Sequence, residues 1–239
     1  MAGRGLKAVI LAGGLGTRLR PYTYFLPKPM LPLGHKPVLE HIVDWLRENG
    51  VKEIVISVEY LRRFIEEHFQ DGRELGVHIT YARARRPLGT AGQLKVAEKY
   101  LDKTFICIYG DTILNFNLND ALKFHRERSA LATIILKRYR TVLKYGFIEL
   151  DKDGLVKRWR EKPEVEGLIN TGCYIMEPRF LQYIPEGRMY GMDMAFKDAL
   201  KAGEPVYGYR ARGLFIDIGD KKSYIQAYEK YLSRLGKIL

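Results

Sequence analysis

The segment Leu11–Leu33, LAGGLGTRLRPYTYFLPKPMLPL, holds residue types that could bind a phosphorylated ligand. Its glycines at positions 13, 14 and 16 let the backbone approach an anion closely, with amide groups pointing toward it. Arg18 and Lys28 add two positive charges to the same segment. Four prolines stiffen the segment and lower the entropy lost when a ligand orders it. The combination predicts a triphosphate-binding loop.

Other glycine-rich phosphate sites fit this segment poorly. A P-loop requires Gly-Lys-Ser/Thr, which the segment lacks. A dinucleotide fingerprint requires a third glycine where Leu19 stands, and its acidic residue would come about twenty residues before Glu59. A tight turn between a strand and a helix would account for the glycines, but not for an arginine and a lysine in the same loop.

Two aspartates could hold a metal ion. Asp111 and Asp217 are far apart in the sequence, but each follows an apolar run and each has a glycine nearby. A single aspartate of this kind can simply cap a helix or fix a turn. Two carboxylates together with phosphate oxygens would suit Mg²⁺, which prefers oxygen ligands and keeps some of its waters.

The elements that must position these residues alternate along the first half of the chain. Short apolar runs predict strands at 7–11, 53–58, 77–81 and 105–109, and helical spacing predicts helices at 38–46, 61–69 and near 94–101. This order predicts an α/β fold with a doubly wound, mostly parallel sheet. Ligands bind at the carboxyl ends of such strands, where both the glycine-rich loop and Asp111 would lie.

The second half of the chain has a different pattern. Strands are expected at 131–137, 145–150, 155–159 and 169–176, with a turn at 151–154, and helices at 179–183, 193–202 and 221–235. This half therefore reads as β-hairpins appended to the parallel core. No flexible linker or internal repeat divides the chain, so we expect a single domain over residues 1–239.

Composition narrows the class of protein. A net charge of +12 favours an anionic partner or the charge-rich surface of a thermophilic protein. The basic residues are spread out and match no nucleic-acid motif, so nucleic acid is not an expected partner.

No apolar stretch reaches the ~18 residues that would span a membrane, and no secretory signal is evident, so we expect a cytoplasmic protein. Cys107 and Cys173 lie in apolar runs and are expected to be buried thiols.

The run GGLGTRLRP followed by PKPMLPL resembles the signature of the sugar-phosphate nucleotidylyltransferases, the NDP-sugar pyrophosphorylases. The resemblance implies a Rossmann-like nucleotidyltransferase fold and a reaction that joins a nucleoside triphosphate to a sugar-1-phosphate, releasing pyrophosphate. It implies that Arg18 stabilises the transition state and that Lys28 contacts phosphate. The same resemblance assigns the nucleotide to Leu11, Ala12, Gly13, Gly14, Gly16 and Thr17.

Further motifs follow in the family's order. Pro87–Gly92 resembles the base-recognition loop, with Gly89 and Thr90 near the base. Gly110-Asp111 and the run FIDIG resemble the two metal-binding motifs, which implies Mg²⁺ at Asp111 and Asp217. The sugar-phosphate motifs imply contacts from Tyr145, Gly146, Glu161, Lys162, Asn170 and Thr171. The resemblance thus implies a nucleotide half at about 1–115 and a sugar-phosphate half at about 116–239.

Specificity is less well defined. The base loop, LINTGCYIM and FIDIG look most like the mannose- and heptose-1-phosphate guanylyltransferases, which favours GTP, while UTP, dTTP and CTP stay open. A glucose-1-phosphate uridylyl- or thymidylyltransferase, a phosphocholine-type transferase and a non-catalytic regulatory subunit are the alternatives.

Two features depart from the family's usual pattern. After the run DIG the family usually has a short residue and a proline before the next tyrosine, whereas this chain has Asp220-Lys-Lys-Ser before Tyr224. Asp220 is expected to cap the last helix. No hexapeptide repeat indicates the left-handed β-helix of many relatives, and a homo-oligomer is left open.

Overall fold

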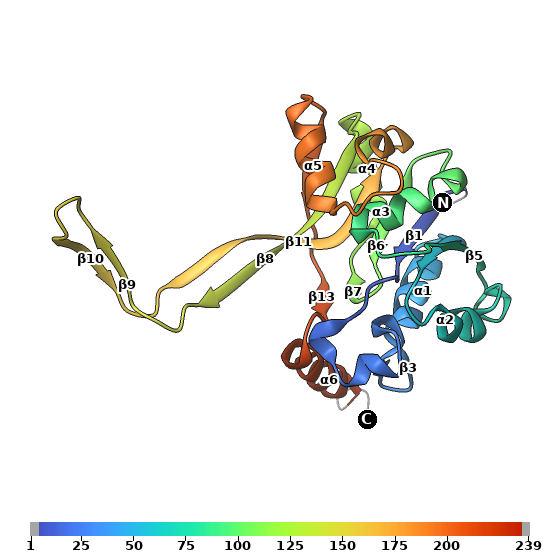
Figure 1. Cartoon of the computed structure of the whole chain (residues 1–239), viewed down its shortest axis with the longest axis horizontal. Coiled ribbons are helices and arrows are strands. Elements are labelled where there is room, and N and C mark those ends of the chain that lie inside the picture. Colours follow the sequence, from blue (N-terminus) through green and yellow to red (C-terminus); the bar gives the residue numbers. More distant parts are fainter. Residues whose placement is uncertain (1–4, 236–239) are drawn as a thin grey trace.

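A seven-stranded sheet forms the centre of the computed structural model, which describes residues 5–235 (Figure 1). In spatial order the strands are β12 (Val206–Arg210), β8 (Ala132–Val142), β11 (Glu164–Met176), β6 (Phe105–Tyr109), β1 (Lys7–Leu11), β4 (Glu53–Val58) and β5 (His78–Arg83). The four neighbouring strands β6, β1, β4 and β5 are parallel. Beyond them β11 runs antiparallel to both neighbours, and the edge strand β12 is parallel to β8. The predicted mostly parallel sheet is confirmed.

The central strands are nearly continuous apolar runs because both of their faces are covered. Val9 pairs with Val55 on one side and with Cys107 on the other, and all three side chains are buried. Cys107 and Cys173 are buried free thiols, as predicted, and burial raises the pKa of both.

Helices cover both faces of the sheet, as a doubly wound fold requires. One hydrophobic core takes buried residues from α1 (Val38–Glu48), α2 (Arg62–Phe69), α4 (Leu118–Glu127) and α6 (Lys221–Leu235). The other takes them from α3 (Gly89–Val96) and α5 (Met192–Lys201). Every helix within residues 5–235 is too short or too polar to cross a lipid bilayer.

Small two-stranded ribbons flank the main sheet. β7 (Thr112–Asn115) pairs with β13 (Leu214–Asp217), and β2 (Pro32–Leu33) pairs with β3 (Lys36–Pro37). Single 3₁₀ turns lie at Thr17–Leu19, Tyr22–Tyr24, Lys28–Met30, Arg73–Leu75 and Glu98–Tyr100, and a longer 3₁₀ helix spans Pro178–Tyr183. None of these four ribbon strands was predicted as a strand from the sequence, and neither was the edge strand β12.

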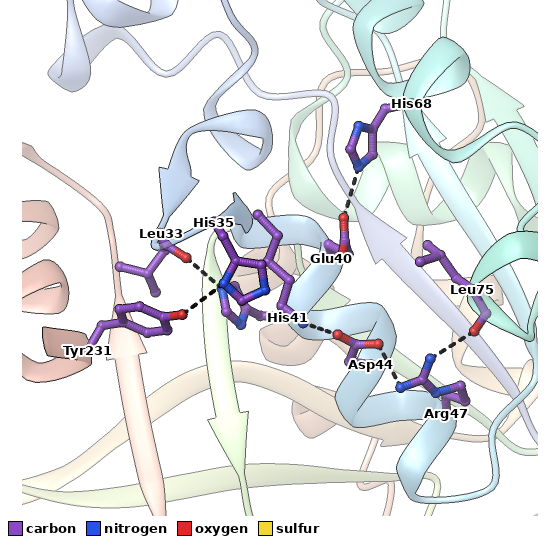
Figure 2. A network of polar contacts seen from close by, with 10 residues as sticks. Leu33, His35, Glu40, His41, Asp44, Arg47, His68, Leu75 and Tyr231 are labelled. Carbon is purple, nitrogen blue, oxygen red and sulfur yellow. Dashed lines mark hydrogen bonds and ion pairs between the residues drawn. The ribbon is translucent and has the colours of Figure 1, made fainter. Parts of the chain in front are cut away.

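A polar network connects the segment after Lys28 to helices α1 and α6 (Figure 2). Asp44 of α1 accepts hydrogen bonds from Lys36 and from Arg47. His41 contacts the Leu33 carbonyl at 2.9 Å, and Tyr231 of α6 lies 3.2 Å from His35. These contacts hold the β2–β3 hairpin in place and so fix the end of the predicted phosphate-binding segment.

A long arm projects from the body (Figure 1). It consists of residues 137–169, in which β8 and β11 continue beyond the sheet as a two-stranded stem. The stem leads to a hairpin of β9 (Phe147–Leu150) and β10 (Val156–Arg160). The predicted hairpin is confirmed, but β8 and β11 are much longer than the predicted strands at 131–137 and 169–176. Their extra residues pair with each other, so the ladder continues outside the core.

The helix expected near 94–101 instead begins at Gly89 and ends at Val96. The sequence Gly-Thr-Ala-Gly looked like loop because two of its residues are poor helix formers. Tertiary contacts override that preference, since the amides of Ala91 and Gly92 donate to the Tyr190 carbonyl at 3.0 and 3.2 Å. The predicted base loop is therefore the first turn of α3.

Candidate active site

The glycine-rich loop leaves β1 at the carboxyl edge of the sheet. The Gly13 amide donates to Gln93 Oε1 at 2.9 Å, and a side chain at Gly13 would lie 3.0 Å from that oxygen. Gly16 has a φ of 61°, and a Cβ there would lie 2.8 Å from Thr23 Cγ2. A Cβ on Gly14 would meet nothing within 4 Å. The backbone conformation and packing thus favour glycine at 16, Gly13 leaves little room for a side chain, and Gly14 faces open space that a ligand could occupy.

Lys28 and Asp111 form an ion pair at the same edge. Lys28 begins a 3₁₀ turn after Pro27, and Asp111 directly follows Gly110 at the end of β6. Their side chains are only 11% and 24% exposed, so little water screens the pair. A cation bound to this carboxylate oxygen of Asp111 would have to displace the Lys28 ammonium.

Asp217 reaches the same place from the other half of the chain. β13 pairs with β7, which sets Asp217 opposite Thr112, the residue after Asp111. Burial and the Asp111 carboxylate raise the pKa of Asp217, while Lys28 and Arg18 lower it. Asp217 nonetheless keeps contact with solvent. Four of the predicted residues, two cationic and two anionic, therefore converge: Arg18, Lys28, Asp111 and Asp217.

A pocket of about 100 Å³ opens beside these charges. Its lining consists of Leu11, Ala12, Gly14, Lys28, Pro29, Thr90, Gln93, Tyr109 and Asp111. Thr90 Oγ1 accepts a hydrogen bond from the Met192 amide at 2.8 Å, and a Cβ on Gly89 would lie 2.6 Å from the Tyr190 carbonyl oxygen. Gly89 therefore permits a close backbone contact that seats the first turn of α3 beside the pocket.

Gln93, Tyr109 and Glu59 were not among the predicted site residues. Gln93 follows the base-loop motif directly and could have been found by extending that motif by one residue. Tyr109 is the last residue of β6, where the alternation of the strand points it to the pocket. Glu59 lies against Gly13, and burial raises the pKa of its carboxyl. Only the tertiary structure places Glu59 there.

The predicted sugar-phosphate residues fall into two groups. Tyr145, Gly146, Glu161 and Lys162 all lie on the arm, which projects from the body (Figure 1), and none of them lines the pocket. A Cβ on Gly146 would lie 2.8 Å from Glu161 Oε2, so the two motifs meet each other. Lys162 adopts a left-handed backbone with φ 42°, an uncommon conformation for a residue other than glycine. Within one chain these residues do not join Lys28 and Asp111.

Asn170 and Thr171 lie at the base of the arm. Asn170 Nδ2 donates to the Tyr174 hydroxyl at 2.7 Å, and that hydroxyl donates to the Tyr109 hydroxyl at 3.1 Å. A chain of hydrogen bonds therefore connects Asn170 to the pocket. Thr171 is buried and its hydroxyl donates to the Ile135 carbonyl at 2.8 Å, so that hydroxyl serves the fold. The backbone of Thr171 could still contact a sugar.

Thr17 and Asp220 both lie near Arg18 in the predicted site. Thr17 begins the 3₁₀ turn that contains Arg18. Asp220 accepts a hydrogen bond from the Ser223 amide at 2.8 Å, and Ser223 Oγ accepts one from the Asp220 amide at 2.9 Å. This reciprocal pair caps α6, as predicted from the sequence.

Asp111 and Asp217 are the two carboxylates of the predicted site that could bind Mg²⁺. Residues 5–235 contain no cluster of three or more His, Cys, Asp and Glu side chains that could hold a metal ion. Asp111 and Asp217 would therefore supply two carboxylates, and phosphate oxygens and water would complete the coordination. Such a donor set fits Mg²⁺, which is commonly bound by one or two carboxylates together with substrate phosphates.

Comparison with known proteins defines the family. A family model described as Nucleotidyl transferase matches residues 7–234. The chain therefore belongs to the nucleotidyl transferase family.

Individual relatives differ in their named substrates. The chain is 39% identical to UTP--glucose-1-phosphate uridylyltransferase of Synechocystis sp., over 96% of this chain and 64% of that protein. It is 37% identical to mannose-1-phosphate guanyltransferase of Yarrowia lipolytica, over 97% of this chain and 66% of that protein. The chain thus spans about two thirds of the length of these relatives. The crystal structure of HddC from Yersinia pseudotuberculosis complexed with GMP-PN has a TM-score of 0.76 and 28% identity, over 95% of this chain and 99% of that chain.

Proposed function

We propose that this protein is a sugar-1-phosphate nucleotidylyltransferase. One observation carries the proposal: Arg18, Lys28, Asp111 and Asp217 converge beside the glycine-rich loop at the carboxyl edge of the sheet. Transfer of a nucleotidyl group depends mainly on positioning and on neutralising charge, and this arrangement supplies both. Membership of the nucleotidyl transferase family supports the same reaction.

The proposed reaction is an in-line substitution at the α-phosphorus. A phosphate oxygen of the sugar-1-phosphate forms a bond to that phosphorus, and the bond to the β-phosphate oxygen breaks. Pyrophosphate leaves with the electron pair. Arg18 and Lys28 neutralise the charge that develops on the α-phosphate and on the leaving group. The attacking phosphate is already anionic at neutral pH, so no general base is needed.

Mg²⁺, held by Asp111 and Asp217, would supply Lewis-acid polarisation of the phosphate oxygens. The Lys28 ammonium pairs with Asp111 in this structure and has further N–H groups that could contact phosphate when the substrates bind. Lys162 would orient the attacking phosphate, and Glu161 would hold hydroxyl groups of the sugar.

GTP and a mannose- or heptose-type sugar-1-phosphate are the proposed substrates. The motifs favour them, and so do a guanyltransferase among the relatives and a structural neighbour complexed with GMP-PN. The second candidate is transfer from UTP to glucose-1-phosphate, which the Synechocystis relative favours.

A substrate grid tests the proposal. The protein is incubated with Mg²⁺, five nucleoside triphosphates and five sugar-1-phosphates, with phosphocholine as a further column. Pyrophosphate release and mass spectrometry of the product are measured. We expect one dominant product, formed from GTP and abolished by EDTA. A dominant product from UTP and glucose-1-phosphate would establish the second candidate. Product from phosphocholine alone would contradict sugar transfer, and no pyrophosphate from folded protein would indicate a non-catalytic binding subunit.

A further inference from the structure

The arm exposes an apolar face. In the β9–β10 hairpin Ile148 pairs with Trp159 and Leu150 pairs with Val156, so the four side chains share one side. They are 44%, 65%, 58% and 52% exposed, respectively. A two-stranded hairpin is only marginally stable in water unless it packs against another surface. This face therefore indicates a partner surface.

The arm is attached to the body only at its base. The hydrogen bonds and ion pairs described for residues 143–163 join residues of the arm to one another, such as Arg160 with Glu149 at 2.9 Å. Six residues of β11, 164–169, separate Glu161 and Lys162 from the sheet. At about 3.3 Å per residue this stem is ~20 Å long. Within one chain the arm thus carries the sugar-phosphate residues away from the pocket.

A second set of apolar side chains is exposed in the segment between Gly14 and Lys28, both of which line the pocket. These rim residues, Leu15, Tyr22, Tyr24 and Phe25, are 42%, 52%, 55% and 72% exposed. Leu15 lies within the glycine-rich loop, and Thr23 ties the other three to that loop by donating to the Gly16 carbonyl at 2.8 Å. An apolar patch at this place marks an interaction surface next to the proposed phosphate site.

We infer that two copies of this chain exchange arms, so that the arm of each completes the active site of the other. The inference rests on the proposed function, because it assigns both halves of one site to the same reaction. In the dimer the apolar face of one arm packs against the rim residues 15 and 22–25 of the partner. Tyr145, Glu161 and Lys162 of one copy then act with Arg18, Lys28 and Asp111 of the other. A two-fold axis makes the exchange reciprocal.

The structure of the stem favours a second copy over an arm that folds back on its own body. Ladder pairing continues from Ile169–Lys137 to Glu164–Val142 without interruption. Arg138 and Arg140 brace the stem through Glu166, at 2.8 and 2.9 Å. The register shifts only between Asn170 and Tyr174, at the base. Closure within one chain would have to bend the arm there and break the adjoining pairs of β8 and β11.

Cross-linking tests the exchange without relying on turnover. Arg20 and Arg158, exposed neighbours of the two apolar faces, are both replaced by Cys in one chain, which leaves both faces intact, and a short bis-maleimide is added; the native Cys107 and Cys173 are buried and unreactive. Each single-Cys variant is the control. Exchange predicts a covalent dimer from the double variant, and little from either control. A link within one chain, or no link, would overturn the inference.

Complementation then tests whether the shared site is catalytic. Lys28→Ala and Lys162→Ala are co-expressed with different affinity tags, and the mixed dimer is isolated through both tags. Each variant alone should lose at least ~10²-fold in kcat. The mixed dimer should regain about half of the wild-type activity, because one of its two sites combines an intact Lys28 with an intact Lys162. A mixed dimer as inactive as its parents, or no mixed dimer, would contradict arm exchange.

These two experiments separate the inference from the proposed function. An inactive wild-type protein that still forms the covalent dimer would refute the transferase and leave the exchange standing. An active protein without the interchain link would refute the exchange alone.

Discussion

At the scale of single residues, the site balances two cations against two carboxylates. Lys28 pairs with Asp111, and Asp217 is held near both of them and Arg18. A substrate with several phosphates would add negative charge here, so a divalent cation and the two basic residues must together compensate for it. Removing one carboxylate should therefore impair chemistry more than folding.

Asp217→Asn should lower kcat at least ~10²-fold, the usual effect of removing one preorganised charge contact. Steady-state kinetics at several Mg²⁺ concentrations would show the loss together with weaker Mg²⁺ dependence. Asp220→Ala is the matched control: it removes the α6 cap three residues away, so Tm should fall slightly while kcat stays within a few-fold. Wild-type turnover in folded Asp217→Asn protein would rule out the metal assignment.

Gly14→Ala and Gly16→Ala should separate binding from folding. A methyl group at Gly14 meets nothing within 4 Å, so Tm should be unchanged while the KM for the triphosphate rises at least ~10-fold, since the backbone can no longer approach it. Gly16→Ala should cost about 1–2 kcal/mol of unfolding free energy, because φ is 61°. Thermal unfolding and kinetics measure both effects. The expectation fails if Gly14→Ala unfolds at a lower temperature or binds nucleotide normally.

At the scale of secondary-structure elements, the β7–β13 ribbon joins the two halves of the site. β7 continues the chain just after Asp111, and β13 ends at Asp217. Ile113 and Ile216 pair across this ribbon and are both buried in the core that includes α1 and α6. The position of the two carboxylates therefore depends on core packing beneath them.

Ile216→Val should cost about 0.5–1.5 kcal/mol of unfolding free energy. Ile54→Val in β4 is the control, since Ile54 is buried in the same core but its strand carries neither carboxylate. Denaturant titration should give similar losses for both variants. Only Ile216→Val should raise the Mg²⁺ concentration needed for half-maximal activity. Equal Mg²⁺ requirements in the two variants would argue against positioning through the ribbon.

At the scale of the whole molecule, the body and the arm have different physical characters. The body has two buried cores around one sheet, whereas the arm is a two-stranded ribbon that exposes apolar side chains. If two arms exchange, an active site exists only in the dimer. Activity must then depend on protein concentration.

Specific activity should fall on dilution below the dissociation constant of the dimer, in step with the loss of dimer seen by sedimentation. Trp159→Ser should shift both curves to higher protein concentration, because it removes the largest apolar group of the arm face. Arg179→Ser, a surface change on the body, is the control and should shift neither. Constant specific activity across the range where the dimer dissociates would exclude a shared site.

Local sequence was enough to determine most elements of the body and to propose a phosphate-binding loop. Buried apolar runs and the spacing of glycine and proline act over a few residues, so the parallel strands and the doubly wound order could be derived without coordinates. The roles proposed for Arg18 and Lys28 come from the family resemblance of their motif. The start of α3 could not, because contacts with Tyr190, far away in sequence, override local preference.

Only the tertiary structure shows how distant residues come to share a site. Asp111 and Asp217 meet because β7 pairs with β13, and Glu59 reaches Gly13 because β4 lies beside β1. The direction of the arm could not be predicted either, since its alternating pattern would suit a hairpin that packs on the body of its own chain or on that of another chain. Strand pairing and packing join residues separated by a hundred positions, and no short sequence pattern records which surfaces they bring together.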